Sequence, residues 1–197
     1  HGSAPHLSAD PVVASAHIIV ALQSIVSRNV DPREMAVITV GAIHAGNAPN
    51  VIPDAVEMRL TVRSYHPAVR QQLRDRITEL VHSQAATLNC KASIDYQWRY
   101  PALINHEGPT AFAREVAVNW LGEGGLIADL QPLTGSEDFS FMLEECPGCY
   151  LIIGNGIGES HGSGGCMVHN PGYDFNDACL PVAASYWVKL VEAFLAR

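Results

Sequence analysis

The stretch VEMRLTVRSYHPAVRQQLRDRITELV, residues 56–81, decides the fold of the first half of this 197-residue chain. It begins with apolar residues at every second position, which are Val56, Met58, Leu60 and Val62. That period of two is typical of a strand with one buried face. From Pro67 the apolar residues recur every three or four positions, which predicts a helix with one apolar face. The stretch therefore predicts a strand followed by a helix that packs on it.

The flanking segments extend this pattern in both directions. Asp10 and Pro11 form a helix start, and the apolar residues after them predict a helix that runs to about Arg28. Residues 35–43 are apolar and rich in β-branched side chains, and residues 91–98 alternate again, so each predicts a strand. If HGSAPH, residues 1–6, ends an earlier strand, the order becomes βαββαβ, the ferredoxin-like split βαβ arrangement.

The second half of the chain differs in composition, which predicts two domains, residues 1–100 and 101–197. The first range contains nine Lys and Arg against eight acids, and the second contains three against twelve. Thirteen of the 16 glycines also lie after position 100. The second range predicts a helix over 109–121, a short helix capped by Ser136, an apolar strand over 150–153 and a last helix with a wide apolar stripe. We expect an α+β protein whose second domain is part of an α/β layer with too few strands to complete a sheet.

Composition argues against several classes of partner. The net charge of −8 and the pI near 5.5 disfavour nucleic acid. No apolar run approaches the roughly 18 residues of a membrane span and no leader is visible, so we expect a cytoplasmic protein with no membrane partner. Five cysteines favour reduced thiols or metal ligands over a disulfide framework. Because the first residue is His1, we also expect this chain to be part of a longer protein.

Two segments of the second half contain candidate site residues. His169 lies in the loop sequence VHNPGYDFND, where a turn leaves an imidazole free to bind a metal. From spacing alone, a loop histidine that bonds a carbonyl is the favoured alternative. Glu137 and Asp138 are adjacent acids that follow Ser136 at a helix start, where acids in the first turn are ordinary.

A structural zinc site is a separate possibility in the same region. Cys146 and Cys149 have C-x2-C spacing, and His161, Cys166 and His169 follow within about twenty residues. Against a zinc site, Cys149 opens the apolar run CYLIIG, where it would pack as a small hydrophobic residue.

The first half offers four residues with more than one interpretation. The pair His1 and His6 in HGSAPH frames a tight turn or a disordered end. Asn50 lies between Pro49 and Pro53, whose rigidity would aim its amide, although a simple turn also explains the prolines. Arg63, on the polar face of the strand, suits a substrate carboxylate or remains a solvated charge.

Together, HGSAPH, AGNAPNVIPD, TVRS, GSEDFSFM and VHNPGYDFND resemble one protein family, in matching order along the chain. They resemble the metal-dependent aminoacylase, hippurate hydrolase and carboxypeptidase family, and most closely its bacterial branch that removes N-acyl groups from amino acids. The resemblance implies a βαββαβ lid and dimerisation domain at residues 1–100, then the C-terminal part of a metallohydrolase catalytic domain.

The resemblance also implies roles for individual residues. His169 matches a metal ligand of a centre with two divalent ions (Zn, Mn, Co or Ni). His1 matches the lid histidine that stabilises the oxyanion in the neighbouring subunit's active site, and Asn50 with Arg63 matches the pair that binds the substrate carboxylate. Glu137 matches a position that is common in the amidohydrolase branch of the family, and the resemblance gives it no definite role. The implied partners are an N-acyl amino acid or peptide with a free carboxylate, and a second copy of the protein.

Three functions from different classes follow. The first is part of a metal-dependent amidohydrolase that is inactive without its N-terminal half. The second is a non-catalytic dimerisation module, and the third is a zinc-knuckle interaction protein.

Overall fold

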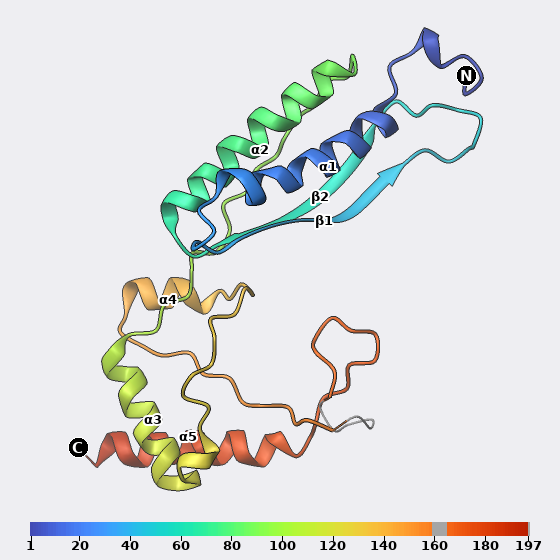
Figure 1. The fold of residues 1–197 in the computed structure, drawn as a ribbon. Helices are drawn as coiled ribbons and strands as arrows, with labels where there is room; N and C mark the ends of the chain where they lie inside the picture. The colour runs from blue at the N-terminus through green and yellow to red at the C-terminus, as the bar shows by residue number, and fades with distance from the viewer. Residues whose placement is uncertain (159–164, 197) are drawn as a thin grey trace. The chain divides into compact units, whose positions relative to one another are not determined.

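A computed structural model describes residues 1–158 and 165–196, and the chain folds into two compact units. Unit 1 comprises His1–Ala102 and Thr134–Ser136, and unit 2 comprises Leu103–Leu133 and Glu137–Arg197. Figure 1 labels the long helices and the strands of the two units.

Unit 1 contains two long helices and one β-hairpin. In chain order, the elements are the 3-10 helix η1 (Pro5–Leu7), α1 (Pro11–Asn29), β1 (Ala36–Ala45), β2 (Val56–Ser64) and α2 (Pro67–Thr87). Both long helices start with proline at the first position, where its missing N–H costs nothing. The Asp10 carboxylate caps α1 by accepting hydrogen bonds from the amides of Val12 and Val13 at 2.9 and 3.3 Å. The elements predicted as α1, β1, β2 and the start of α2 are therefore present, with β1 ending at Ala45, two residues beyond its predicted end.

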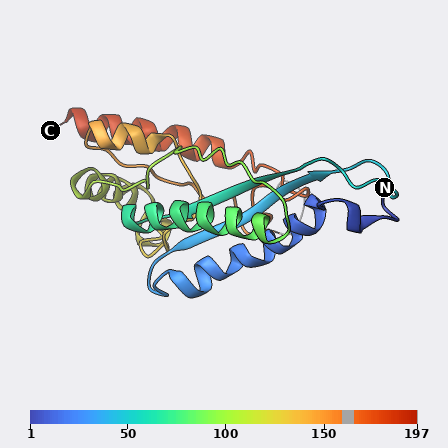
Figure 2. The same cartoon turned by 90° about the horizontal axis from the view of Figure 1, so that it is seen from above.

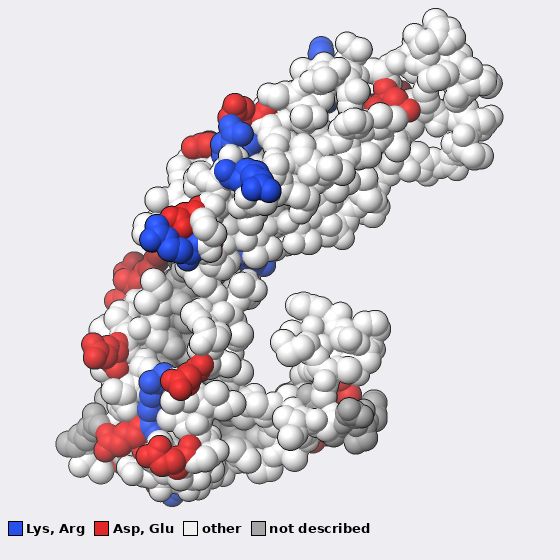
Figure 3. Space-filling model, in the orientation of Figure 1, with Lys and Arg blue, Asp and Glu red and all other residues white. Residues whose placement is uncertain are grey.

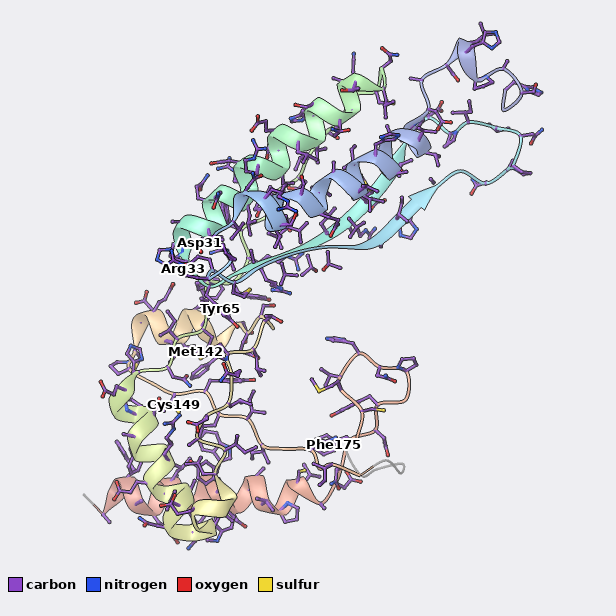
Figure 4. The ribbon with its side chains drawn as sticks, in the orientation of Figure 1. Asp31, Arg33, Tyr65, Met142, Cys149 and Phe175 are labelled. Carbon is purple, nitrogen blue, oxygen red and sulfur yellow. The ribbon has the colours of Figure 1, made fainter. Side chains whose placement is uncertain are left out.

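The core of unit 1 lies between the two helices and one face of the hairpin. Figure 2 shows α1 and α2 side by side along the strands. Leu22 and Ile25 of α1 and Leu73 of α2 have no solvent exposure. Burying each such side chain stabilises the fold by about 1.5–3 kcal/mol. The loop from α1 to β1 is closed by Asp31 and Arg33, whose side chains form an ion pair at 2.7 Å (Figure 4).

The hairpin is antiparallel, and its second face is open within unit 1. Val37 pairs with Arg63 and Thr39 pairs with Thr61, with a register irregularity between Val40 and Ala42. Since side chains alternate across a strand, these pairs lie on the face opposite the core. The polar residues of β2 on that face are exposed or half-buried. The face can therefore receive another surface.

The strand expected over residues 91–98 is absent among the described residues, although its alternation is real. Ala92, Ile94 and Tyr96 pack against the core, while Ser93 and Asp95 are exposed. A strand also needs a hydrogen-bonded neighbour, and in a split βαβ fold the last strand lies beside the first. Residues 1–7 instead form a turn and η1, so no such first strand lies among the described residues. The α+β class holds, and the described residues do not show the complete βαββαβ order.

Helix α1 departs from the expectation that no segment approaches the length of a membrane span. By length and composition alone its 19 residues are apolar enough to cross a bilayer. Its inner face, however, buries Ala14, Ile18, Leu22 and Ile25 within unit 1. These buried contacts make it the core helix of this unit.

Unit 2 contains α3 (Glu107–Leu121), the 3-10 helix η2 (Glu123–Gly125), α4 (Phe139–Glu145) and α5 (Cys179–Leu195). Helices α3 and α5 pack on each other. The Tyr186 hydroxyl of α5 donates to the Ala113 carbonyl of α3 at 2.7 Å, and the Phe112 and Phe194 rings meet edge to face. These contacts hold α5 against α3 through one side of the helix.

Two details of unit 2 differ from the sequence predictions. Asp138, not Ser136, is the residue before α4, and its side chain makes no capping bond. Residues 150–153 form no strand in the described part of the chain. The side chain of Asn105 instead brackets the backbone of Tyr150, accepting from its N–H at 2.7 Å and donating to its carbonyl at 2.9 Å. A side chain thus makes the pair of bonds that a neighbouring strand would have made.

The expected apolar stripe of α5 is present and largely uncovered. No described residue of α5 is fully buried, and Trp187 and Phe194 are 69% and 66% exposed. The view in Figure 3 shows mainly uncharged surface, with Lys, Arg, Asp and Glu in small mixed groups. Large apolar side chains at this exposure mark a surface that another part of a protein covers.

Candidate functional site

The turn that contains His1 is fixed by three successive amides. The N–H of Gly2 donates to the carbonyl of Asn50 at 2.8 Å, and the N–H of Ala4 donates to the carbonyl of His1 at 2.9 Å. Between them, the N–H of Ser3 donates to Nδ1 of the His1 ring at 3.2 Å. The Ser3 hydroxyl lies 2.8 Å from the same nitrogen. The turn therefore fixes both the backbone and the ring of His1, and His1 remains exposed.

Asn50 lies in the loop from β1 to β2 and contacts the His1 turn through its backbone. A Cβ added to Gly2 would lie 3.1 Å from the Asn50 carbonyl carbon and oxygen. This close approach explains why position 2 is a glycine. Gly46 begins the loop with φ of +56°, and a Cβ there would meet Pro53. The proline-framed loop thus positions Asn50 beside His1, although the two residues are far apart in sequence.

Arg63 lies at the other end of the hairpin from Asn50. Val56, next to the loop, and Arg63 are seven residues apart on one strand, which is about 23 Å at the usual rise per residue. Figure 4 labels Tyr65, just after β2, at the end away from the loop. Arg63 is half-buried on the open face, opposite Val37. One small substrate therefore cannot bind Asn50 and Arg63 of the same chain.

His169 lies in unit 2 on a strained turn. Its φ is +70°, a left-handed conformation that is uncommon outside glycine and often marks a functional position. The next residue stabilises the turn, because the Asn170 carboxamide oxygen accepts from the Gly172 N–H at 2.8 Å. The segment between the His169 turn and α5 is held by Asn155, whose side chain accepts from the Asn176 N–H at 2.9 Å. The loop therefore presents an exposed imidazole at a defined place.

Glu137 has a specific partner. The Tyr150 hydroxyl donates to its carboxylate at 2.9 Å, and the Tyr150 ring packs on Phe139 with ring centres 5.6 Å apart. The bond from Tyr150, followed by one from Asp138, lowers the pKa of Glu137 below its ordinary value. The same bond raises the pKa of Tyr150. Both directions agree, because the bond favours a charged carboxylate and a neutral phenol.

The described residues contain no group of three or more His, Cys, Asp or Glu side chains that would hold a metal. His169, predicted as a metal ligand, therefore has no second and third ligand beside it within the described residues. The alternative of a zinc knuckle gains no support from the described part of the chain. Burial raises the pKa of the Cys149 thiol (Figure 4), which opposes the thiolate that zinc needs, and His161 lies outside the described residues. All five cysteines are free thiols.

The sequence predictions overlooked two partners of candidate residues. Ser3 is only two positions from His1, so local sequence was enough to suggest its bond to the ring. Tyr150 was assigned to a buried strand, and its bond to Glu137 links positions 13 residues apart through a loop. Only the tertiary structure shows that bond.

Comparison with known proteins shows clear relatives. The chain is 38% identical over 197 residues to a hippurate hydrolase of Campylobacter jejuni, covering 99% of this chain and 49% of that protein. It is 34% identical to an N-acetyl-L-cysteine deacetylase of Bacillus subtilis, covering 95% of this chain and 42% of the relative. The chain thus spans about half the length of these curated relatives.

The fold has solved counterparts as well. A chain from methicillin-resistant Staphylococcus aureus aligns with 97% of this chain and 47% of its own length, at 26% identity and a TM-score of 0.70. A dinuclear metal binding peptidase of the M20 family from Bacillus subtilis, at 24% identity, aligns with 95% of this chain and 46% of its own length at a TM-score of 0.62. The sequence profile of Peptidase family M20/M25/M40 matches residues 4–193. The chain belongs to the Peptidase M20/M25/M40 family.

Proposed function

We propose that this chain is the C-terminal part of a metal-dependent amidohydrolase that cleaves N-acyl amino acids. The observation that carries this proposal is the 2.8 Å bond from the Gly2 N–H to the Asn50 carbonyl. This bond holds the turn that contains His1 beside Asn50, so two candidate residues that are far apart in sequence form one site. Family membership supports amide hydrolysis. The names of the hippurate hydrolase and the N-acetyl-L-cysteine deacetylase point to an acylated amino acid as substrate.

Unit 1 serves as the lid and dimerisation domain in this proposal. Its hairpin has helices on one face only, so the open face and the outer edges of the two strands remain for a second copy of the protein. The residues after about 101 serve as part of the catalytic domain. The uncovered apolar stripe of α5 fits this role, because a helix of an α/β layer packs on a sheet.

His1 and Asn50 act as one unit in the active site of the neighbouring subunit. The ring of His1 donates a hydrogen bond to the oxyanion that forms when water attacks the amide carbonyl. Asn50, held beside it, donates its amide to the substrate. Arg63 binds a substrate carboxylate in a different site of the dimer, because about 23 Å of strand separate it from Val56, at the end of β2 next to the Asn50 loop.

The metal centre of the complete enzyme takes one imidazole ligand, His169, from this chain. Two divalent ions, Zn, Mn, Co or Ni, would polarise an amide carbonyl and activate water. The remaining ligands do not come from a cluster within the described residues. The described residues alone therefore provide substrate contacts and one metal ligand without a complete centre.

The proposal is tested with a full-length protein that contains this chain. We expect it to release the free amino acid from N-acetyl and N-benzoyl amino acids, and to lose turnover on dialysis against a chelator. Substrates whose carboxylate is converted to an amide should react more slowly. A full-length protein that dimerises but hydrolyses none of these substrates would instead be a non-catalytic dimerisation module.

A further inference from the structure

We propose that Ser3 is a positioning residue that selects the tautomer of the His1 ring. This inference rests on the proposed role of His1 as an oxyanion donor. The ring makes two short-range contacts at Nδ1, one from the Ser3 N–H at 3.2 Å and one with the Ser3 hydroxyl at 2.8 Å. A backbone N–H can only donate a hydrogen bond, so Nδ1 must be the acceptor.

An accepting Nδ1 decides where the ring proton lies. In a neutral imidazole one nitrogen has the proton and the other has the lone pair, so Nε2 has the proton here. With Nδ1 unprotonated, the Ser3 hydroxyl also donates to it. Both donors draw electron density from the ring, which makes Nε2–H a stronger donor to a developing negative charge.

The backbone of the turn supports this role without using the Ser3 side chain. The flanking amides of Gly2 and Ala4 bond to Asn50 and to the His1 carbonyl, respectively. Removing the Ser3 hydroxyl therefore leaves these two bonds in place. What is lost is the hydroxyl contact with Nδ1, while the Ser3 N–H still donates to that nitrogen. A variant at this position therefore isolates the contribution of the hydroxyl to the state of the ring from formation of the turn.

The first experiment measures the ring directly in this chain. Nitrogen-15 NMR of histidine-labelled protein, at alkaline pH where imidazoles are neutral, gives the shifts of both ring nitrogens. The His1 signals are assigned by their loss in His1→Ala. We expect a protonated Nε2 and an unprotonated Nδ1, with both shifts moving toward those of a free imidazole in Ser3→Ala and restored in Ser3→Thr. Identical shifts in Ser3→Ala, or a protonated Nδ1 in the unmodified chain, overturn the proposal.

The second experiment measures catalysis in the full-length protein. Ser3→Ala should lower kcat about 2- to 10-fold, the size of one neutral hydrogen bond, with unchanged KM and with recovery in Ser3→Thr. An unchanged kcat in Ser3→Ala, where His1→Ala is strongly impaired, contradicts the positioning role. If His1→Ala itself retains full kcat, the oxyanion role of His1 fails, and with it the catalytic part of this inference. The nitrogen shifts then still decide whether Ser3 sets the tautomer.

Discussion

The N–H of Gly2 donates a hydrogen bond of 2.8 Å to the carbonyl of Asn50. This bond connects the first turn of the chain to the loop between β1 and β2. A displacement of the loop therefore displaces the His1 turn as well. The proposed site residues of unit 1 therefore form two groups, His1 with Asn50 at one end of the hairpin and Arg63 at the other.

We expect this chain by itself to show no amidase activity. The described residues bring no three metal-binding side chains together, whereas a two-metal centre needs about four to six ligands. The assay measures release of free amino acid from N-acyl amino acids, with Zn, Mn, Co or Ni added in turn. Turnover that follows the purified chain through successive columns would contradict this prediction.

In the full-length protein, His169→Ala should abolish turnover by loss of bound metal. The exposed imidazole on its left-handed turn is the one ligand assigned to this chain. Metal content and rate are measured on the same preparation, with His82→Ala, an exposed position of α2, as the control. A His169→Ala enzyme with full metal content and full rate would exclude His169 as a ligand.

Arg63→Ala should raise KM with little change in kcat. A contact to a carboxylate that does not react is equally strong in the ground state and the transition state. A charge-assisted hydrogen bond of this kind corresponds to a rise of about 10- to 150-fold. Arg59→Ala, which removes an exposed arginine paired with Glu57 on the same strand, is the control. An equal loss of rate for substrates with and without the carboxylate would remove Arg63 from the site.

Tyr150→Phe should raise the pKa of Glu137 toward the ordinary carboxyl value of about 4.3. The hydroxyl of Tyr150 is the main cause of the lowered pKa of Glu137. A lowered pKa in the folded state stabilises the fold above the ordinary carboxyl range, and this contribution is lost as the pH falls through the folded-state pKa. The free energy of unfolding of the variant should therefore differ from that of the unmodified chain at neutral pH, and the two values should converge in acid.

The titration of Glu137 is followed by carbon-13 NMR of its carboxyl group. Tyr173→Phe, in the His169 loop, is the matched control and should leave the Glu137 titration unchanged. The alkaline side gives an independent check. The Tyr150 pKa is raised by the same bond, so that contribution to stability is lost as the pH rises through the folded-state pKa. A Glu137 titration that is the same with and without the Tyr150 hydroxyl would contradict the assignment.

The sequence predicted elements whose signals are local. The helix cap at Asp10 and the alternation in β2 each depend on neighbouring positions, and both are present. Strands at residues 91–98 and 150–153 were predicted by the same kind of pattern and are absent among the described residues. A strand needs a hydrogen-bonded neighbour from elsewhere in the chain, and local alternation contains no information about that neighbour.

The candidate site shows the same division. The positive φ of His169 occurs next to Asn170, Pro171 and Gly172, which are residues typical of turns. The rigid loop at Asn50 likewise follows from its neighbouring prolines. The contact between the turn at Gly2 and the carbonyl of Asn50 depends on how the hairpin loop folds back, which no local pattern predicts. The separation of Asn50 from Arg63 follows from the length of β2, because most of that strand lies between the two residues.

The most direct test of the account mixes inactive full-length subunits. Combining His1→Ala with His169→Ala should restore activity to about a quarter of the unmodified level. About half of randomly exchanged dimers are mixed, and each has one intact site of two. Combining His1→Ala with Asn50→Ala should restore nothing, because both residues act in the neighbour's site and every mixed dimer lacks one of them in each site. If His1→Ala and His169→Ala subunits form mixed dimers that remain inactive, or if His1→Ala and Asn50→Ala subunits rescue each other, the claim that His1 and Asn50 act as one unit across the dimer is wrong.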